Sequence, residues 1–541
     1  MTTVAILALL LSQAVAQTRA PEIESITRAE MEADLHFLAS DTMRGRLTGT
    51  EEYLQAAKFI ESRFRRIGLK PAGPGPAYEH PFTLLWSELA DGNLFRITHG
   101  ATSQPKLLEE FMPLFFSASA RARAKVTFAG FGIDAPMLKW NDLSGGAIAG
   151  RILLMLDGEP APDDPKSIFD GVVTSIHADP LRKALAAQDH GALAVLFVNG
   201  RQKSDGVHRF TSEARAYWPP KPPHLKRYAL TSQTDRLRIP VATISPAAAQ
   251  ILLGNRQLAD LLIQSETGIT PIPLDHEAEI AVSLKRHIVE DRNIVAMVEG
   301  SGLKQEAVII SAHYDHNGAE GNQIYNGADD NGSGTVALLD IAEAYAQAAR
   351  RGQRPERTVI FAAWGSEERC CGPLLGAWAW LANPPFPLEK TVAVLNMDMI
   401  GRSEEVPEGG GARFRGLPIQ TAASNAGAVN IIGASYSPDL RQAVIAANSG
   451  IDLLLRQRYD NNRSNLLRRS DHWVFLNHGI PALWFHTGLH PDYHTAFDRP
   501  EKIDYPKMER VARLVHQLSW NLAQQPSRPR MLQPRPIPPP D

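Results

Sequence analysis

The chain has 541 residues, of which 44% are hydrophobic and 21% are charged, and its formal net charge is -3. This is the composition of an ordinary globular protein, long enough for several domains or for one large domain with an insertion. So small a net charge excludes the strong basic field of a nucleic-acid-binding protein, and we expect no nucleic acid among its partners.

The first residues resemble a secretory signal peptide. An apolar run from Val4 to Leu11 is followed by the small residues Ala14 and Ala16, as before a cleavage site. We therefore predict a signal peptide over residues 1–16, and a secreted or periplasmic mature protein, although the usual basic start is missing. An ordinary N-terminal helix is the alternative. No other segment approaches about 18 uninterrupted apolar residues, so we expect no transmembrane segment.

Two helices are predicted after this leader, the second over Glu51–Ile67. Within it, Ala56, Ile60 and Phe64 lie on one apolar face. Gly68 follows directly and is a typical helix stop.

The middle and the end of the chain differ in texture. Over residues 125–273, short β-like runs such as GRILLML and LAVLFV alternate with turns, which predicts a separate, mostly β module. Over residues 281–524, β-branched runs such as EAVIISA and RTVIFAAWG alternate with helical patterns, including a helix from Gly334 to Arg350. This alternation indicates an α/β fold with a doubly wound, mostly parallel sheet. The proline-rich tail, 525–541, is expected to be disordered or PPII-like.

Histidines and carboxylates stand just after the predicted strands of this sheet. In such a sheet, ligands gather beyond the carboxyl ends of the strands. One such residue alone is usually a cap or a solvated side chain, but five loaded strand ends together favour a site. Two imidazoles with three carboxylates can hold two divalent cations if one carboxylate bridges. The mixed nitrogen and oxygen set suits two Zn²⁺ ions per chain, with Co²⁺ or Mn²⁺ as possible substitutes. The residues concerned are His313, Asp315, Asp330, Glu367, Glu368, Asp398 and His494.

Five motifs in this order, HYDH, GADDNGSG, GSEE, NMDMIGR and YHTAFDRPEKID, resemble those of the M28 family of dinuclear zinc exopeptidases. The resemblance implies a zinc exopeptidase fold, with residues 22–110 as the N-terminal part and 281–524 as the catalytic part of one peptidase domain. The module at 125–273 resembles, more loosely, the protease-associated domain that is often inserted in such enzymes.

The resemblance also implies a metal-binding role for five residues. Asp330 would be the carboxylate that bridges the two ions. His313 and Asp398 would complete one metal site, and Glu368 and His494 would complete the other.

Three more residues acquire roles in the same way. Asp315 would orient the imidazole of His313 and raise its basicity. Glu367 would be the general base that takes a proton from the bridging water and delivers it to the leaving amine. Tyr493 would donate a hydrogen bond to the oxyanion, with core packing as the alternative.

Four residues near these motifs are left outside the metal set. Cys370 and Cys371, the only cysteines, are neighbours, which excludes a disulfide framework and favours two free thiols. They also interrupt the compact turn that usually follows the glutamate pair in this family. We expect His316 and His472 to be structural, because lone histidines are more often satisfied core residues than ligands.

The preferred function is an exported di-zinc aminopeptidase that removes N-terminal residues from peptides. The first alternative is a carboxypeptidase acting on peptides with C-terminal glutamate, for which Arg369 and Arg402 are candidate carboxylate-binding residues. A non-catalytic, receptor-like binding domain is a third possibility, but it would be expected to have lost ligands that are intact here. The full dinuclear set also argues against a single-zinc enzyme of the glutaminyl cyclase type.

Overall fold

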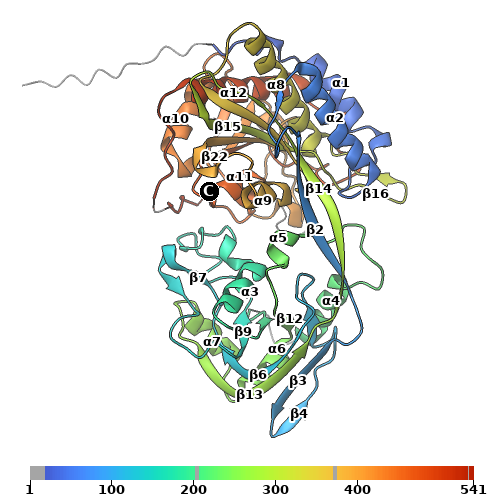
Figure 1. Ribbon diagram of the computed structural model, residues 1–541, viewed down its shortest axis with the longest axis vertical. Coiled ribbons are helices and arrows are strands. Elements are labelled where there is room, and N and C mark those ends of the chain that lie inside the picture. The colour runs from blue at the N-terminus through green and yellow to red at the C-terminus, as the bar shows by residue number, and fades with distance from the viewer. Residues whose placement is uncertain (1–18, 202–205, 369–373, 534, 541) are drawn as a thin grey trace, which may run out of the picture.

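The computed structural model describes residues 19–201, 206–368, 374–533 and 535–540. The predicted signal peptide, Cys370, Cys371 and Arg369 lie outside the described residues. The molecule consists of two bodies, each built on its own sheet (Figure 1).

The first body contains a ten-stranded sheet with a parallel centre. In its middle, β18 (Arg357–Trp364), β15 (Leu303–His313), β19 (Thr391–Met397) and β22 (Ala482–His486) are neighbours and run in the same direction. Antiparallel pairs flank this centre, β14 with β18 and β20 with β22. The predicted α/β fold is therefore confirmed with a parallel centre, but the sheet as a whole is mixed, because five of its nine strand pairs are antiparallel. The remaining strands are β1 (Lys70–Pro71), β2 (Glu79–Leu89), β11 (Ala229–Leu230), β14 (Leu284–Val298), β20 (Ala428–Ile432) and β21 (Leu454–Arg456).

Helices cover both faces of this sheet, as expected for a doubly wound fold. One face packs in a single apolar core against α1 (Arg28–Leu38), α2 (Glu51–Ile67), α8 (Gly334–Arg350), α10 (Pro438–Ala447) and α12 (Tyr505–Gln524). The other face packs against α9 (Leu375–Ala382) and α11 (His472–Leu476). With both faces covered, β18 and β19 are buried at every position. Among the described residues, no helix combines the length and the apolar character needed to cross a bilayer.

The two helices predicted most clearly have the predicted bounds, and capping explains why. The side chain of Thr50 accepts a hydrogen bond from the backbone of Tyr53 at the start of α2, and Gly68 ends that helix with a φ of 79°. At the start of α8, the Asn331 side chain accepts a hydrogen bond from the backbone N–H of Gly334 at 3.0 Å. Local signals of this kind fix helix ends without help from the rest of the chain.

The second body is an eight-stranded sheet with its own apolar core. The strands β6, β9, β10 and β12 form its parallel part. Most of the predicted module, 125–273, lies within this body, although β11 pairs with β2 in the first sheet. The second sheet begins earlier than the predicted module, at Leu94, and ends later, at Ala281. Its strands are β3 (Leu94–His99), β4 (Ala101–Ser103), β5 (Phe111–Pro113), β6 (Arg121–Phe128), β9 (Ile152–Leu156), β10 (Ala194–Val198), β12 (Val241–Ile244) and β13 (Ile272–Ala281), and its helices are α3 (Pro180–Asp189), α4 (Gly206–Tyr217), α5 (Thr231–Thr234), α6 (Pro246–Leu253) and α7 (Leu258–Ser265).

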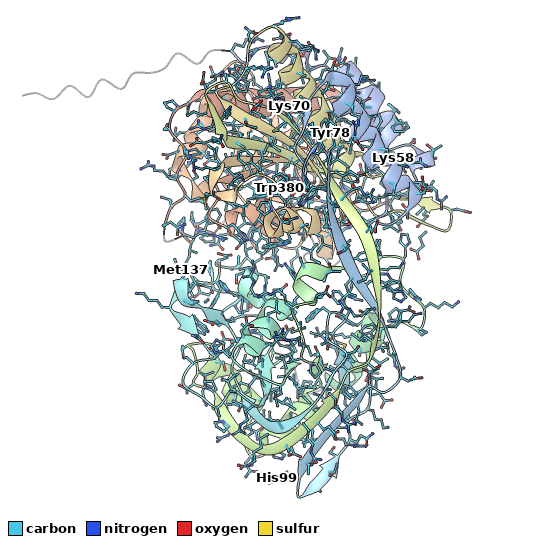
Figure 2. All side chains as sticks on the ribbon, in the orientation of Figure 1. Lys58, Lys70, Tyr78, His99, Met137 and Trp380 are labelled. Carbon is cyan, nitrogen blue, oxygen red and sulfur yellow. The ribbon has the colours of Figure 1, made fainter. Side chains whose placement is uncertain are left out.

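Burial differs sharply between the interior and the tips of the two bodies. Trp380, on α9, is fully buried inside the first body, whereas Met137, beside the small hairpin of β7 (Asp134–Ala135) and β8 (Trp140–Asn141), is 89% exposed and projects from the second (Figure 2). The Met137 side chain therefore lies outside the core, whereas its neighbours Leu138 and Trp140 pack against it.

Two long strands and several side chains join the bodies. β2 and β14 pair antiparallel and run from one body into the other (Figure 1). Side chains form further contacts between the bodies. Asn461 accepts a hydrogen bond from the backbone of Val172 at 2.9 Å, and the His224 ring contacts the Asn317 carbonyl at 2.8 Å. A cavity of about 710 Å³ lies between the bodies, with aromatic side chains of both in its lining.

The proline-rich tail is held against the first body. Arg528 pairs with Glu306 at 2.6 Å, and Arg530 pairs with Asp439 at 2.7 Å. The described part of the tail forms neither helix nor strand. The structure agrees with the expected extended tail but not with the alternative of a disordered tail. Arginines between the prolines form ion pairs with acidic residues of the folded domain.

Candidate metal centre

The central strands of the first sheet carry the predicted ligands to one edge. His313 is the last residue of β15, and Asp398 directly follows β19. Glu367 and Glu368 follow β18 by a short turn. Because β18, β15 and β19 are adjacent and parallel, these side chains emerge from the same edge of the sheet.

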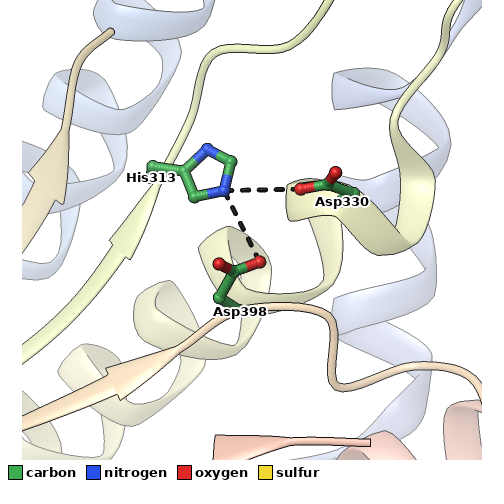
Figure 3. A group of neighbouring side chains, drawn as sticks. All are labelled: His313, Asp330 and Asp398. Atoms are coloured by element: carbon green, nitrogen blue, oxygen red, sulfur yellow. Dashed lines mark ion pairs between the residues drawn. The ribbon is translucent and has the colours of Figure 1, made fainter. Parts of the chain in front are cut away.

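The first group of ligand atoms consists of one imidazole and two carboxylates. His313 Nε2 lies 3.4 Å from Asp330 Oδ1 and 3.5 Å from Asp398 Oδ1 (Figure 3). All three residues are almost fully buried. The three atoms are close enough together to contact a single ion.

A second group forms around the other oxygen of the same aspartate. His494 Nε2 lies 3.0 Å from Asp330 Oδ2 and 3.0 Å from Glu368 Oε2. Asp330 thus presents Oδ1 to the first group and Oδ2 to the second. The five residues predicted as ligands are therefore brought together by the fold, with the shared carboxylate in the middle.

The spacing of these atoms fits a metal better than it fits hydrogen bonding. Four zinc ligands with bonds of roughly 2.0–2.1 Å in a tetrahedron lie about 3.3 Å apart. The separations here range from 3.0 to 3.5 Å. Yet His313 Nε2, Asp398 Oδ1 and His494 Nε2 have no hydrogen-bond partner among the described residues, because their approach angles are unsuitable. Such atoms point toward a shared space between them, as ligands do.

The charge of the cluster also calls for a cation. Although burial opposes protonation, Glu367 and Asp398 raise the pKa of His313 well above its usual value. Against the same effect of burial, Glu368 and Asp330 raise the pKa of His494 to about 10. The carboxylates thus draw protons onto both imidazoles, and divalent cations would replace those protons with a larger positive charge.

Asp315 holds both sides of the cluster together. Its Oδ1 lies 3.5 Å from His313 Nδ1, in line with the predicted orienting role. The same carboxylate also accepts the backbone N–H of Glu367 at 2.9 Å and that of Glu368 at 3.1 Å. It therefore ties the turn after β18 to the end of β15, a connection that the sequence did not predict.

The turn that carries Asp330 is fixed by the acidic residues around it. Asp498 accepts the backbone N–H groups of Asp329 and Asp330, at 3.0 and 3.1 Å. Asp329 itself accepts the Gly401 N–H at 2.6 Å and pairs with His490 at 3.2 Å. Asp329 is therefore engaged away from the ligand groups, and its neighbour Asp330 faces them.

A relay of side chains orients Asp398. Ser470 donates to Asp398 Oδ2 at 2.6 Å, Asn396 donates to Ser470 at 2.7 Å, and Ser311 donates to Asn396 at 2.8 Å. One oxygen of Asp398 is thus occupied, which leaves Oδ1 directed at His313. The relay joins neighbouring strands and could not be read from local sequence.

Glu367 and Tyr493 border the ligand groups without belonging to them. Glu367 Oε2 lies 3.8 Å from His313 Nε2, and burial together with Glu368 and Asp398 raises the pKa of Glu367 well above its usual value. The Tyr493 ring stacks on that of His494, with 3.8 Å between their centres. Burial and the charges of Asp330 and Glu368 raise the pKa of Tyr493, so its hydroxyl stays protonated and able to donate.

Sequence reasoning missed two buried residues here. His316, expected to be structural, is fully buried, and its Nδ1 lies 2.6 Å from Glu368 Oε1. Asp471 is fully buried close to His313 and Asp398, and burial raises its pKa well above the usual range. The HYDH motif itself was the available signal for His316, since it places a second imidazole near the same strand end.

The two basic residues proposed for a carboxypeptidase site need revision. Arg402 is bound by the Asp492 carboxylate at 3.1 Å and is not free to hold a substrate. Arg369 lies outside the described residues. Arg469, which the sequence did not single out, lies near enough to Tyr493 to lower its pKa against the effect of burial, and its side chain makes no hydrogen bond or ion pair within the described ranges.

Comparison with known proteins finds similarity to a family over part of the chain. Residues 293–519 match the family model of peptidase family M28. Over 214 residues the chain is 28% identical to probable glutamate carboxypeptidase AMP1 of Arabidopsis thaliana, which covers 38% of this chain and 26% of that protein. Over 267 residues it is 27% identical to a probable zinc metalloprotease of Pyrenophora tritici-repentis, covering 44% and 53%. The chain thus spans between about a quarter and about half of these curated relatives.

The solved structure of the aminopeptidase from Aneurinibacillus sp. strain AM-1 aligns with 96% of this chain and 98% of its own, at 18% identity and a TM-score of 0.46. The doubly wound sheet, with histidine and carboxylate side chains gathered at its strand ends, defines an α/β protein with a candidate metal centre. Over residues 293–519, the chain is similar to peptidase family M28.

Proposed function

We propose that this chain is an exported aminopeptidase that binds two zinc ions and removes N-terminal residues from peptides. The observation that carries the proposal is the placement of Asp330 between two ligand groups, with one carboxylate oxygen facing each. Such a shared carboxylate is what a dinuclear site needs. Export rests on the leader-like residues 1–16.

In this proposal the ligand set is the predicted one. His313, Asp330 and Asp398 hold one ion, and Asp330, Glu368 and His494 hold the other. When bound, zinc supplies Lewis acidity and stabilises the negative charge that develops on the scissile carbonyl oxygen.

The remaining steps belong to side chains beside the ligands. Glu367 faces the ligand atoms from 3.8 Å, takes a proton from the attacking water and returns it to the leaving amine. The protonated Tyr493 hydroxyl donates a hydrogen bond to the oxyanion. Asp315 holds the His313 imidazole and the backbone of Glu367 in a fixed position relative to each other.

Charge around the site favours a free amino terminus as the recognised group. The described residues at the cluster are carboxylates in excess, and a carboxylate can receive an α-ammonium group. Arg402, the cation suggested for a C-terminal carboxylate, is already bound to Asp492. Access is narrowed by the second body, whose His224 contacts the loop that follows β15.

A carboxypeptidase is the second candidate, and one observation favours it. Arg469 lies beside Tyr493 without an ion pair among the described residues and can hold a carboxylate. The name of the Arabidopsis relative, a probable glutamate carboxypeptidase, agrees with this alternative.

A substrate panel separates the candidates. The mature protein is assayed for zinc and tested on aminoacyl-chromophore, N-blocked and C-terminal-glutamate peptides, with and without a chelator. We expect two zinc ions per chain and chelator-sensitive cleavage of the free-amine substrates alone. Cleavage only of the C-terminal-glutamate peptides, abolished by Arg469→Ala, would establish the carboxypeptidase, and no metal with no cleavage would leave a binding domain.

A further inference from the structure

The second ligand group contains one imidazole more than the five-residue set provides. His316 Nδ1 lies 2.6 Å from Glu368 Oε1 and 4.0 Å from Asp330 Oδ2. Its ring centre is 5.6 Å from that of His494, and the two rings meet edge to face at 69°. His316, Asp330 and Glu368 can contact one ion together.

The position of His316 is built by distant parts of the chain. Its backbone N–H donates to the Arg46 carbonyl at 3.2 Å. The buried Arg46 guanidinium in turn donates to the carbonyls of Tyr314 and Gly327, at 3.0 and 2.9 Å. It thereby joins the loop that carries His316 to the turn that precedes Asp330.

The ring is also packed in place. Gly327 lies against it, and a Cβ atom at position 327 would come within 2.4 Å of His316 Cγ. Any side chain at that position would therefore push the imidazole away from Glu368. Since the ring is fully buried and confined, its Nδ1 stays directed at the second group.

We propose that His316 is a ligand of the second metal ion, together with His494, Asp330 and Glu368. The second group then offers two imidazoles and two carboxylates, the ligand number of a closed zinc site, whereas the first offers one imidazole and two carboxylates and keeps a position open. The two ions differ in consequence: the second is anchored and the first is exposed to exchange and to water. This inference rests on the proposed metal centre but not on the proposed peptide substrate.

The competing role is that of a positioning residue. In that case the Nδ1–H group donates a hydrogen bond to Glu368 Oε1, which the distance of 2.6 Å also permits. Loss of such an outer partner weakens metal binding by roughly 10–100-fold. A measured loss of zinc affinity therefore separates the two roles only if it exceeds about 100-fold. The number of imidazoles bound to the zinc has to be observed directly.

His316→Asn is the matched substitution, because its amide can still donate a hydrogen bond to Glu368 but brings no imidazole. It is made in the full-length protein and in the His313→Asn background, where only the second group is complete. One equivalent of zinc is added, and the imidazoles bound to it are counted by X-ray absorption spectroscopy. Zinc retention is measured by competition with a chelator, and melting temperatures confirm that each variant is folded.

We expect two imidazoles on the zinc of His313→Asn and one on that of His313→Asn/His316→Asn. Zinc retention at the second site should fall more than about 100-fold, beyond the loss an outer partner causes. His494→Asn, made in the same His313→Asn background, should also leave one imidazole bound to the zinc. An unchanged imidazole count after His316→Asn overturns the proposal. A wild-type protein that binds both ions but cleaves no peptide refutes the proposed substrate and leaves this result intact.

Discussion

In both sheets, polar residues follow the ends of parallel strands, but these residues have different roles in the two bodies. In the second body, β9 is buried at every position and is followed by Asp157 and Glu159. Glu159 accepts a hydrogen bond from the backbone of Ser175 at 2.9 Å and another from its hydroxyl. Lys183 is buried nearby and donates hydrogen bonds to the carbonyls of Leu156 and Gly158. Burial raises the pKa of Glu159 to about 7, while the Ser175 hydrogen bonds and, to a smaller extent, the charge of Lys183 lower it.

In the first body the corresponding acids have no such compensation. No lysine or arginine within the described part of the chain forms a salt bridge with Asp330, Glu367, Glu368 or Asp398. Histidines face them instead, at 2.6 to 4.0 Å. The contrast teaches that a strand-end acid becomes a metal ligand when its neighbours leave its charge unbalanced, and a structural group when they balance it.

The strongest way to break the contrast is to remove the shared carboxylate. Asp330→Ala removes a carboxylate oxygen from both ligand groups at once, so we expect both zinc ions to be lost and hydrolysis to fall to background. Metal analysis and activity of the purified variant check this. Asp157→Ala, at an exposed strand-end acid of the second body, should change neither quantity. Two ions retained by Asp330→Ala would show that the acid does not bridge.

The next effect is confined to the chemistry. Glu367→Gln keeps the shape of the side chain but removes the proton acceptor, so we expect turnover to fall by about 10²–10⁴. Zinc content should stay at the wild-type value, because Glu367 is not in the ligand set. Zinc lost in parallel with activity would mean that Glu367 and Glu368 have exchanged roles.

Much of the site could be predicted because its residues follow apolar runs directly. His313 ends β15 and Asp398 follows β19, so the pattern of strands placed both at one edge. The helix bounds followed from equally local signals, such as Gly68 and Asn331.

What escaped prediction depends on contacts between distant segments. The direction of His316 is set by Arg46 and by the absence of a side chain at Gly327. The ordered tail depends on acids such as Glu306 and Asp439, far from it in sequence. The joining strands β2 and β14 pair from Leu284 with Leu89 to Ile294 with Glu79, which no periodicity of a single segment reveals.

A smaller effect on the same site should follow from Asp315→Asn. The carboxylate faces His313 Nδ1 and accepts the backbone of Glu367 and Glu368, but it is not a ligand in the proposed set. We expect zinc retention to weaken by about 10–100-fold, as is typical when the partner of a ligating histidine is lost. Competition with a chelator measures it. Retention equal to wild type would show that the backbone alone holds the imidazole in place.

The reverse experiment removes the compensating cation from the second body. Lys183→Met leaves the carbonyl acceptors of Leu156 and Gly158 without their buried donor. We expect a loss of about 1–3 kcal/mol in the free energy of unfolding, with zinc content unchanged. Chemical denaturation measures it, and the exposed Lys166→Met is the control. A change in zinc content would mean that the two bodies are coupled more closely than their separate cores indicate.

The mildest prediction concerns a buried acid outside both strand ends. Asp340, on α8, has no hydrogen bond to its carboxylate from the described residues, and Arg63 lies 3.9 Å from it. Burial, then the nearby Glu30, raises the pKa of Asp340 to about 8. In the unfolded chain the group is ionised above a pKa of about 4, so between pH 4 and about 8 the folded state binds the extra proton.

Stability from this residue therefore falls as pH rises across that window. Asp340→Asn keeps the shape, removes the titration and should be relatively more stable at pH 8 than at pH 5. We expect the difference in melting temperature between variant and wild type to grow by about 1–2 °C over that range, with zinc saturating at both pH values. A constant difference would mean that Arg63 keeps Asp340 ionised in the folded protein over this pH range.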